Sequence, residues 1–487
     1  MAIADSTADS AAGSARARPL PTSASYGITV RVYAPPSSSV VGELATAVGQ
    51  AGGLVTAIDV SESRADRVTV DVSCSAVNGE HAGEIVDALR AVPTVTVHRV
   101  SDRTFLLHLG GKISVQPKVP LRTRDDLSMA YTPGVGRVAL ALAQHPEDVA
   151  KLTIKGNSVA VVTDGSAVLG LGNLGPGAAL PVMEGKAALF KRFADIDAWP
   201  ICLDTQDAGE IVEVVRAISP GFGGINLEDI SAPRCFEIER RLRESLDIPV
   251  FHDDQHGTAI VVTAALTNAL RCVSKSLAHA RIVIAGGGAA GTAIVTLLLA
   301  AGASHLLVWD REGILAPSDS QLNEAKRDLA ARTNPEGVTG DLHDALRGAD
   351  VFVGVSAPGV LPAEWITDMA PDPVVFALAN PDPEVDVDAA QHRTAVLATG
   401  RSDYPNQINN VLAFPGVFRG LLDARAHEVS TPMLLSAAAA LAQCVSDDQL
   451  NATYIVPSVF DPAVPTAVAA AVRAAAQGTA AGVDGNS

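Results

Sequence analysis

The stretch RIVIAGGGAAGTAIVTLLLAAGA, residues 281–303, begins as a short apolar strand and continues as an apolar helix. Between the two, Gly286, Gly288 and Gly291 form the pattern G-x-G-x-x-G, in which backbone N–H groups at a helix N-terminus can face a pyrophosphate. The next apolar run, HLLVWD, ends in Asp310, 19 residues after Gly291. An acid at that place accepts a hydrogen bond from an adenosine ribose. The stretch therefore predicts a dinucleotide-binding domain.

The same acid bears on which dinucleotide is bound. A carboxylate repels a 2′-phosphate, so Asp310 favours NAD over NADP. The next residue, Arg311, could neutralise Asp310 or bind a phosphate. We therefore expect NAD, and NADP stays open.

Further apolar runs extend this domain towards the C-terminus. DVFVGVS, VVFALAN and AVLATG follow one another, separated by helix-like segments. Continuous apolar runs of this length are typical of parallel strands that are buried on both faces. The pattern predicts an α/β fold with a doubly wound, Rossmann-type parallel sheet, followed by alanine-rich helices.

The region from Tyr26 to about Ser101 has a different pattern. Strand, helix, strand, strand, helix and strand follow one another, with a Gly52-Gly53 turn after the first helix. This βαββαβ order resembles the small ACT-type regulatory domain, whose members often bind an amino acid near such a turn. A ferredoxin-like oligomerisation module without a ligand is the alternative, because this fold has many functions.

Composition narrows the classes of partner. The chain has 487 residues, a formal net charge of -18 and a pI near 5, which gives no electrostatic reason to bind nucleic acid or an anionic membrane. Its five cysteines are scattered and contain no Cys-x-x-Cys pair, which fits a reducing cytoplasm. No apolar run reaches the roughly 20 residues of a membrane span.

Two acidic pairs mark a candidate metal site. FGGINLEDISAP, residues 222–233, has Glu228-Asp229 after a strand-like run, and VFHDDQHGTAI, residues 250–260, has Asp253-Asp254 after another. Ligands of open α/β sheets gather at the carboxyl ends of strands, so the two pairs should share one pocket. Such a group of carboxylates needs a cation, and oxygen ligands suit Mg²⁺ or Mn²⁺.

The second stretch allows two other interpretations. His252 and His256 have the His-x-x-x-His spacing of a zinc-binding helix. Pro249 argues against zinc, because it imposes an extended entry and places His252 before the first helical turn. Helix capping by the acids is the third interpretation and is compatible with metal binding. For each histidine we expect a structural hydrogen bond.

A tyrosine and a lysine complete the candidate chemistry. YTPGVGRVA, residues 131–139, and VMEGKAALFKRF, residues 182–193, contain Tyr131 and Lys186. With TDGSAVLGLGNLGP, INLEDISAP, HDDQHGTAI, IVIAGGGAAG, ALANP and NNVLAFPG they closely resemble, in order, the motifs of the malic enzyme family. That family oxidises L-malate with NAD or NADP and decarboxylates the product to pyruvate, using Mg²⁺ or Mn²⁺.

The resemblance implies a role for each residue of these motifs. Lys186 would be the general base, with a pKa lowered by the cation and by burial, and Tyr131 the general acid. The remaining roles are Glu228, Asp229 and Asp254 as metal ligands, Asp253 as a catalytic residue next to these ligands that does not itself touch the metal, and Asn380, Asn409 and Asn410 as ligands of the malate carboxylate.

Two departures from the family pattern affect these expectations. The family often has a substrate-binding arginine near Ala167, where this chain has only Ser166 and Ala167, so the second carboxylate ligand is undefined. The N-terminal βαββαβ unit is an addition that indicates allosteric control. A malolactic enzyme that converts malate to lactate and a catalytically inactive NAD or ligand sensor are the alternative functions, and we expect a homodimer or larger assembly.

The predicted organisation has three folded domains. In chain order we expect a disordered tail over residues 1–24, the ACT-like domain over 25–105, the catalytic domain over 106–275, the NAD-binding domain over 276–430, C-terminal helices over 431–477 and a second tail over 478–487.

Overall fold

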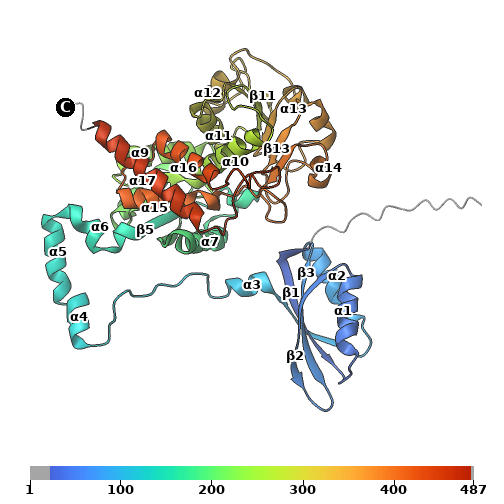
Figure 1. Cartoon of the computed structure of the whole chain (residues 1–487). Coiled ribbons are helices and arrows are strands. Elements are labelled where there is room, and N and C mark those ends of the chain that lie inside the picture. Colours follow the sequence, from blue (N-terminus) through green and yellow to red (C-terminus); the bar gives the residue numbers. More distant parts are fainter. Residues whose placement is uncertain (1–21, 484–487) are drawn as a thin grey trace, which may run out of the picture. The chain divides into compact units, whose positions relative to one another are not determined.

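The computed structural model describes residues 22–483 and divides the chain into two compact units (Figure 1). The first unit ends at Gly111 and the second begins at Lys112. Most of the predicted N-terminal tail lies outside the described residues, and its last two residues, Ser23 and Ala24, belong to the first strand.

The first unit has the predicted βαββαβ order. An antiparallel sheet with strand order β2-β3-β1-β4 packs on two helices. The valines at alternate positions of β1 and β3 are buried, because alternate side chains of a strand face the same side. The elements are β1 (Ser23–Ala34), α1 (Val40–Gln50), β2 (Leu54–Ser63), β3 (Val68–Ala76), α2 (Gly79–Arg90) and β4 (Thr96–Asp102), followed by α3 (Arg103–His108).

The second unit begins with a segment that has no core. None of residues 113–154 is buried. Residues 119–150, which we name the arm, contain α4 (Arg124–Ala130) and α5 (Gly134–Gln144), and α6 (Val149–Leu152) leads from the arm to the first strand of the unit. Figure 1 shows α4 and α5 next to each other and apart from the sheets of this unit.

The first sheet of the second unit is parallel, with strand order β6-β5-β7-β8. The first strand in sequence, β5, lies between β6 and β7, so the strand order reverses there. Ligands of open α/β sheets bind at such a reversal, outside the carboxyl ends of the strands. The elements are β5 (Ser158–Thr163), α7 (Pro176–Ala194), β6 (Asp197–Cys202), α8 (Ala208–Ile218), β7 (Gly224–Leu227), α9 (Arg234–Ser245) and β8 (Val250–His252).

The second sheet confirms the doubly wound prediction, with one difference. Its order is β11-β10-β9-β12-β13-β14, and all of these strands are parallel except the two-residue edge strand β11. Such a short strand leaves no periodic signal in the sequence. The elements are β9 (Arg281–Ala285), α11 (Ala289–Ala300), β10 (His305–Asp310), β11 (Gly313–Ile314), α12 (Glu324–Thr333), α13 (Leu342–Leu346), β12 (Val351–Gly354), β13 (Val374–Ala377), α14 (Val387–Gln391) and β14 (Val396–Thr399).

Four apolar helices complete the second unit: α10 (Thr258–Cys272), α15 (Phe414–Ala424), α16 (Thr431–Gln443) and α17 (Ala463–Val483). Helix α17 packs beside α15 and α16 (Figure 1). The predicted C-terminal tail from residue 478 is wrong in its first part, because α17 continues to Val483. Residues 484–487 lie outside the described part of the chain.

A cluster of buried aromatic rings joins the elements that surround the carboxyl ends of the first sheet. Phe190 of α7 lies 4.7 Å from Phe414 and 5.2 Å from Phe418 of α15, measured between ring centroids. Phe251 of β8 lies 5.6 Å from Phe418. Each edge-to-face pair contributes about 0.5–1.5 kcal/mol beyond the burial of its area. The cluster therefore fixes α7 and β8 with respect to α15.

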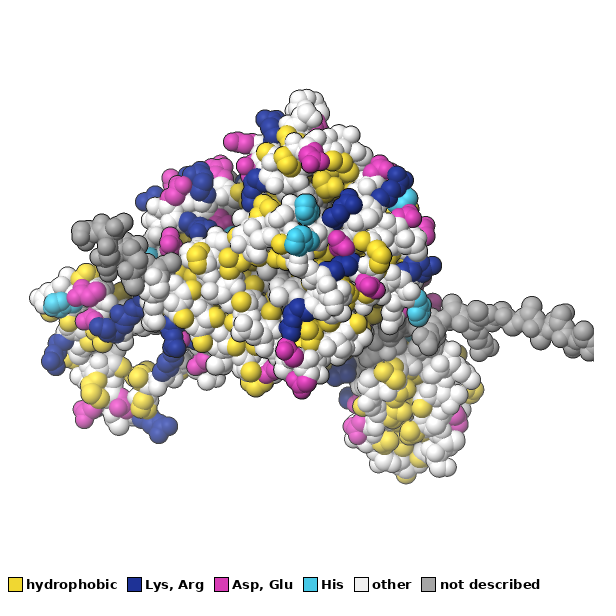
Figure 2. Space-filling model, turned by 45° about the horizontal axis from the view of Figure 1, so that its top comes forward, with side chains coloured by type: hydrophobic (Ala, Val, Ile, Leu, Met, Phe, Trp, Pro, Cys, Tyr) yellow, Lys and Arg dark blue, Asp and Glu magenta, His cyan; other side chains and the backbone are white. Residues whose placement is uncertain are grey.

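Charged side chains are scattered over the molecular surface. Figure 2 shows acidic and basic side chains interspersed on the face that it draws, without a broad basic area. This agrees with the net charge of -18. No helix among the described residues is long and apolar enough to cross a membrane.

We predict that Gly420→Ala destabilises the second unit. A Cβ at Gly420 would lie 2.6 Å from the carbonyl oxygen of Ala469 and 2.8 Å from Cβ of Val472, so α15 and α17 would have to separate. Overpacking of this kind costs about 1–3 kcal/mol, which a lower urea midpoint of the unfolding transition would reveal. Gly177→Ala in α7 is the control, because a Cβ there has no neighbour within 4 Å. Equal midpoints for the two variants would contradict the packing argument.

Candidate active site

The two acidic pairs meet at the carboxyl ends of neighbouring strands. Strand β7 pairs with β8 in parallel, with Leu227 opposite His252. Glu228-Asp229 and Asp253-Asp254 follow directly after these strand ends. The two acidic pairs therefore lie close together, as the sequence predicted, beside the reversal of strand order.

Glu228, Asp229 and Asp254 form a compact group of possible metal ligands. One carboxylate oxygen from each lies within 4.8 Å of the others. Glu228 and Asp229 are buried, and the backbone N–H of Asp229 donates to Oδ2 of Asp254 at 2.8 Å. Oδ2 of Asp229 is buried and has no hydrogen-bond partner. A buried carboxylate oxygen without a donor is what a cation site requires, because an unpaired buried charge is costly.

Lys186 is the buried cation that faces this group. Its Nζ lies 2.9 Å from Oε1 of Glu228 and donates to Oδ2 of Asp253. The ammonium group also lies 4.0 Å from the centroid of the Phe414 ring. The lysine is in the middle of α7, which the aromatic cluster holds in place. Lys186, Glu228 and Asp253 therefore form one buried ionic network.

The predicted asparagines have different surroundings. Nδ2 of Asn410 donates to Oδ2 of Asp253, so Asn410 reaches the ionic network. Oδ1 of Asn409 accepts from the backbone N–H of Val411 at 3.0 Å, so this oxygen caps a short helical turn. Asn380 is exposed, and its carbonyl oxygen lies so close to Gly170 that a Cβ there would be only 2.6 Å away. This approach joins the loop after β13 to the TDGSAVLGLG loop.

The acids of the site resist ionisation. Burial, together with the neighbouring charges of Asp254 and Glu228, raises the pKa of Asp229 to about 8. Burial likewise raises the pKa of Asp253 to about 8, against the opposing effect of Lys186. The pKa values of Glu228 and Asp254 are also raised, chiefly by burial. A low-dielectric pocket with this many acids favours their neutral forms unless a cation is bound.

The expectation of a lowered pKa for Lys186 is not met by these side chains alone. Burial lowers the pKa of Lys186, but the carboxylates of Asp253 and Glu228 outweigh burial and raise it above its usual value. Burial and the metal were expected to lower this pKa, whereas the ion pairs with the two acids were not foreseen.

The glycine loop and Asp310 are adjacent, as their spacing predicted. The backbone N–H of Gly287 donates to Oδ2 of Asp310 at 3.1 Å. A Cβ at Gly291 would lie 1.8 Å from the carbonyl oxygen of Gly286, so the turn from β9 into α11 requires glycine there. Lys326 of α12 lies 3.0 Å from Oδ2 of Asp310. No local pattern indicated Lys326, because its position depends on how α12 packs.

Comparison with known proteins places both parts of the second unit in one family. The N-terminal domain model of malic enzymes matches residues 110–243, and the model of their NAD-binding domain matches residues 255–477. The NAD-dependent malic enzyme of Geobacillus stearothermophilus is 54% identical over 460 residues, 94% of this chain and 96% of that protein. The chain belongs to the malic enzyme family.

The names of other members of the malic enzyme family differ in the cofactor or the activity that they state. The bifunctional malic/malolactic enzyme of Bacillus subtilis is 51% identical, covering 78% of this chain and 94% of that protein. An NADP-dependent malic enzyme of Halomonas elongata is 47% identical over 75% of this chain and 90% of that protein. The crystal structure of the NAD-dependent malic enzyme of Thermotoga maritima has a TM-score of 0.74 at 50% identity, covering 77% of this chain and 99% of that one.

Residues 1–109, nearly all of the first unit, lie outside both malic enzyme family models. Because residues 112–487 make up about three quarters of the chain, the alignment that covers 94% of it extends into the first unit. The βαββαβ order is observed, and the resemblance to ACT domains stays a prediction.

Of the two histidines, His256 forms the structural hydrogen bond that we expected and His252 does not, because both ring nitrogens of His252 are buried without a hydrogen-bond partner. Nε2 of His256 lies 2.6 Å from Oε1 of buried Glu239, and this ion pair outweighs the effect of burial and lowers the pKa of Glu239. His252 is fully buried, and burial lowers its pKa to about 4, so it is neutral. No histidine joins the group of possible metal ligands found among residues 22–483. The zinc interpretation therefore has no support here.

Tyr131 is the predicted catalytic residue that does not join the others. It ends α4 in the arm and is 68% exposed, whereas Lys186 is buried.

Sequence reasoning also missed Asn226, whose Nδ2 donates to Oε2 of Glu228 at 2.8 Å, and Phe414 beneath Lys186. Both belong to motifs that were recognised, INLEDISAP and NNVLAFPG.

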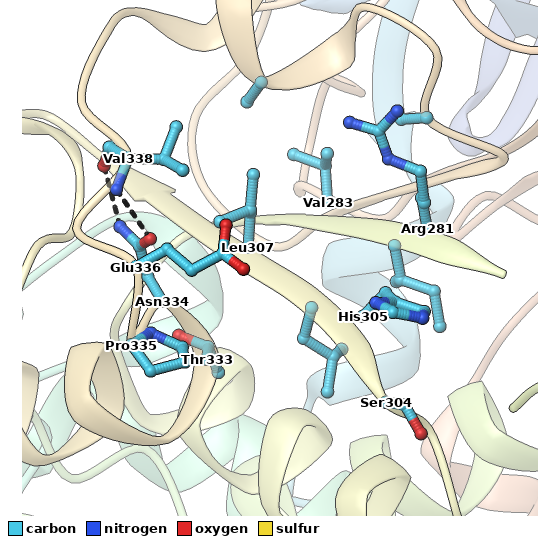
Figure 3. A pocket seen from close by; sticks show the side chains of 14 residues that line it. Arg281, Val283, Ser304, His305, Leu307, Thr333, Asn334, Pro335, Glu336 and Val338 are labelled. Carbon is cyan, nitrogen blue, oxygen red and sulfur yellow. Dashed lines mark hydrogen bonds between the residues drawn. The ribbon is translucent and has the colours of Figure 1, made fainter. Parts of the chain in front are cut away.

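A cavity of about 230 Å³ lies elsewhere in the NAD-binding domain (Figure 3). Arg281 and His305, at the starts of β9 and β10, line it together with Glu336. Asn334 on its wall binds the backbone of Val338. Because the glycine loop follows the opposite end of β9, this cavity is not part of the dinucleotide site.

We predict that His256→Ala destabilises the protein. The substitution removes the 2.6 Å partner of Glu239 and leaves a buried carboxylate with fewer donors. A loss of about 1–3 kcal/mol in unfolding free energy is expected, measured by urea denaturation at neutral pH. His427→Ala is the matched control, because His427 pairs with Asp247 at the exposed surface and should matter by less than about 0.5 kcal/mol. Equal losses in the two variants would refute a structural role for His256.

Proposed function

We propose that the chain catalyses oxidative decarboxylation of L-malate to pyruvate and CO₂ with reduction of NAD. The observation that carries the proposal is the buried network of Lys186, Glu228 and Asp253 beside a group of possible metal ligands, in a chain that also has the family's NAD-binding domain. The names of the relatives with 54% and 50% identity agree with it.

The donor set fits Mg²⁺ or Mn²⁺, with Glu228, Asp229 and Asp254 as the protein ligands. Hard divalent cations prefer carboxylate oxygens, and these three offer oxygens within 4.8 Å of one another. The unpartnered Oδ2 of Asp229 and the raised pKa values of the acids support the same assignment. When bound, the cation supplies positive charge that stabilises oxygen anions of the substrate.

Lys186 is the proposed base. It accepts the proton of the C2 hydroxyl while a hydride leaves C2 for the nicotinamide, and the resulting oxaloacetate loses CO₂ from C4. Asp253, which binds both Lys186 and Asn410, positions the amine. Tyr131 then protonates C3 of enolpyruvate. The base must be neutral to act, so the role of Lys186 requires that the charges of Glu228 and Asp253 are offset.

Polar amides are the proposed ligands of the malate carboxylate. Asn410 borders the ionic network, and Asn380 borders the TDGSAVLGLG loop. Asn409 would act through its Nδ2, since its oxygen caps the turn. Near Ala167, the hydroxyl of Ser166 is already bound to Asp164 and to the backbone of Ser231.

NAD is the proposed cofactor, on the evidence of Asp310 beside the glycine loop. Lys326 neutralises part of its charge, and several relatives have NADP in their names. A comparison of kcat/KM for NAD and NADP decides between them, and a clear preference for NADP would overturn the assignment.

A malolactic reaction is the second candidate, because a relative with 51% identity is named as a bifunctional malic/malolactic enzyme. Accumulation of NADH and pyruvate from malate would exclude lactate as the main product. A catalytically inactive sensor is the third candidate function, and it predicts no turnover.

We further propose that the protein is cytoplasmic, on the evidence of its five free cysteines. Its family membership leads us to propose a homodimer or larger assembly. We also propose an effector site in the first unit.

We predict that Lys186→Met lowers kcat for malate oxidation by about 10²–10⁴-fold, the usual contribution of a general base. NADH formation is measured with saturating malate, NAD and Mn²⁺. Lys275→Met is the control, because Lys275 is also mostly buried and paired with a carboxylate, Asp350, but lies outside the site. Near-normal turnover by Lys186→Met would reject the base assignment, and no turnover by the unsubstituted enzyme would reject the proposed function.

We predict that Mn²⁺ stabilises the protein more at about pH 8.5 than at about pH 6. Asp229 and Asp253 have pKa values of about 8 in the folded protein. An aspartate in an unfolded chain has a pKa of about 4. Between these values the folded ion-free protein keeps protons that the unfolded chain releases, so its stability falls as pH rises towards 8. A cation binds the ionised acids and has fewer protons to displace at high pH.

Thermal melts with and without Mn²⁺ at the two pH values test this expectation. Asp229→Asn should remove the increase in Tm, and Asp350→Asn, outside the cluster, should keep it. A larger increase at the lower pH, or an equal increase in Asp229→Asn, would contradict a metal site at these carboxylates.

A further inference from the structure

The cavity of about 230 Å³ in the NAD-binding domain is lined by charges of both signs. Arg281 is the first residue of β9, His305 is the first residue of β10, and Glu336 follows α12. Figure 3 shows Glu336 on one side of the cavity and Arg281 and His305 on the other side. A guanidinium and an imidazole therefore lie across the cavity from a carboxylate.

The three polar side chains have no partner within the protein. Among residues 22–483, none of the side chains of Arg281, His305 and Glu336 forms an ion pair or a hydrogen bond. The nearby carboxylate of Asp350 is occupied by Lys275, 2.8 Å away, and by the backbone N–H of Arg281. Single unpaired charges are common on protein surfaces, but here opposite charges line one cavity and each is free to bind a ligand group.

The register of β9 and β10 arranges these groups in two rows. Arg281 lies opposite His305 in the parallel pairing of the two strands. Two residues further along, Val283 lies opposite Leu307. Side chains two residues apart on a strand face the same side, so the basic row and an apolar row lie next to each other on one face of the sheet. The remaining apolar side chains of the lining are Ile282, Leu306, Pro335, Val338, Ala345 and Ala349.

Both sides of the cavity are held in place before any ligand binds. Asn334 is buried, and its side chain donates to the carbonyl oxygen of Val338 at 2.7 Å and accepts from its N–H at 2.8 Å. These bonds close the loop that carries Glu336. On the other side, a Cβ at Gly348 would lie only 3.1 Å from Nη1 of Arg281, so the guanidinium packs closely on this glycine. A preformed site loses little conformational freedom on binding.

We propose that this cavity binds a free α-amino acid with an apolar side chain. The ligand's carboxylate binds Arg281 beside His305, its ammonium group binds Glu336, and its side chain packs on Val283 and Leu307. A simple anion would leave Glu336 facing a like charge, and a simple amine would leave Arg281 unpaired, so only a zwitterion matches both sides. Sites for drug-sized ligands have about 300–1,000 Å³, whereas 230 Å³ suits a smaller molecule.

The proposed amino acid site and the dinucleotide site lie at opposite ends of the same strands. Strands β9 and β10 begin at the cavity and lead to the glycine loop and to Asp310. Strand β9 has five residues, so its two ends are about 15 Å apart at about 3.3 Å per residue. An amino acid can therefore bind together with NAD, and occupation of the cavity does not depend on the proposed reaction.

Photo-leucine, a leucine analogue with a diazirine in its side chain, tests the site on the full chain. Irradiation should attach it to chymotryptic peptides that contain residues 281–283, 305–307 or 333–338, identified by mass spectrometry. A hundredfold excess of L-leucine should lower this labelling at least tenfold. Labelling that L-leucine does not reduce, or labelling confined to the first unit, would overturn the proposed site.

Two fragments of leucine test the zwitterion assignment. Isovalerate has the carboxylate and the apolar group without the ammonium group, and isopentylamine has the ammonium group without the carboxylate. At the concentration of L-leucine used above, each should lower labelling of the cavity by less than twofold. Competition by either fragment as strong as that of L-leucine would overturn recognition of both charges.

Substitutions on the two sides of the cavity connect the labelling to these residues. Arg281→Gln and Glu336→Gln should each lower labelling of the cavity at least tenfold, because each removes one charged partner of the ligand. Glu364→Gln is the matched control, because Glu364 is also exposed and lies outside the cavity. Labelling of both cavity variants equal to that of the control would refute the site.

Addition of NAD tests whether the cavity is separate from the dinucleotide site. Saturating NAD should change the labelling of the cavity peptides by less than twofold. A loss of more than tenfold would show that the two ligands exclude each other and would overturn a separate amino acid site.

Discussion

Four carboxylates of Glu228, Asp229, Asp253 and Asp254 gather at two neighbouring strand ends, and Lys186 is the buried cation that the structure places against them. One ammonium group cannot neutralise four acids in a low-dielectric pocket, so their pKa values rise. Such repulsion persists only where the backbone is held rigidly. The parallel pairing of β7 with β8 and the aromatic cluster of α7, β8 and α15 provide that rigidity.

The two sheets of the second unit place their sites by the same rule. Each sheet reverses its strand order, next to β5 in the first and next to β9 in the second, and each site lies outside the carboxyl ends of the strands there. The close approach of Asn380 to Gly170 connects the loops of the two sheets. The proposed hydride transfer requires the substrate and the dinucleotide to lie close together.

The site also shows how one side chain can serve two partners. Oδ2 of Asp253 accepts from both Lys186 and Asn410, so it links α7 of the first sheet to the turn that follows β14. Asn226 supports Glu228 from within β7. Because every one of these groups is polar and buried or half-buried, the loss of one partner leaves another unsatisfied. The network is therefore cooperative, and its members cannot be weighed separately.

The sequence by itself determined the features that depend on local pattern. Apolar runs and glycine spacing predicted the parallel strands of the second sheet, two strands of the first, the glycine loop, the position of Asp310 and the acids at two strand ends, because each rests on residues near one another in the chain. The βαββαβ order of the first unit was predictable for the same reason.

Only the tertiary structure decided which distant residues meet. It pairs Lys186 with Glu228 and Asp253, which raises the pKa of the lysine against the sequence-based expectation, and it brings Lys326 to Asp310. In the folded chain, Oδ1 of Asn409 caps a helical turn, and Tyr131 is exposed and apart from Lys186 and the acids. These outcomes depend on packing between segments that no local periodicity relates, and burial sets the charge state of each group only once its neighbours are fixed.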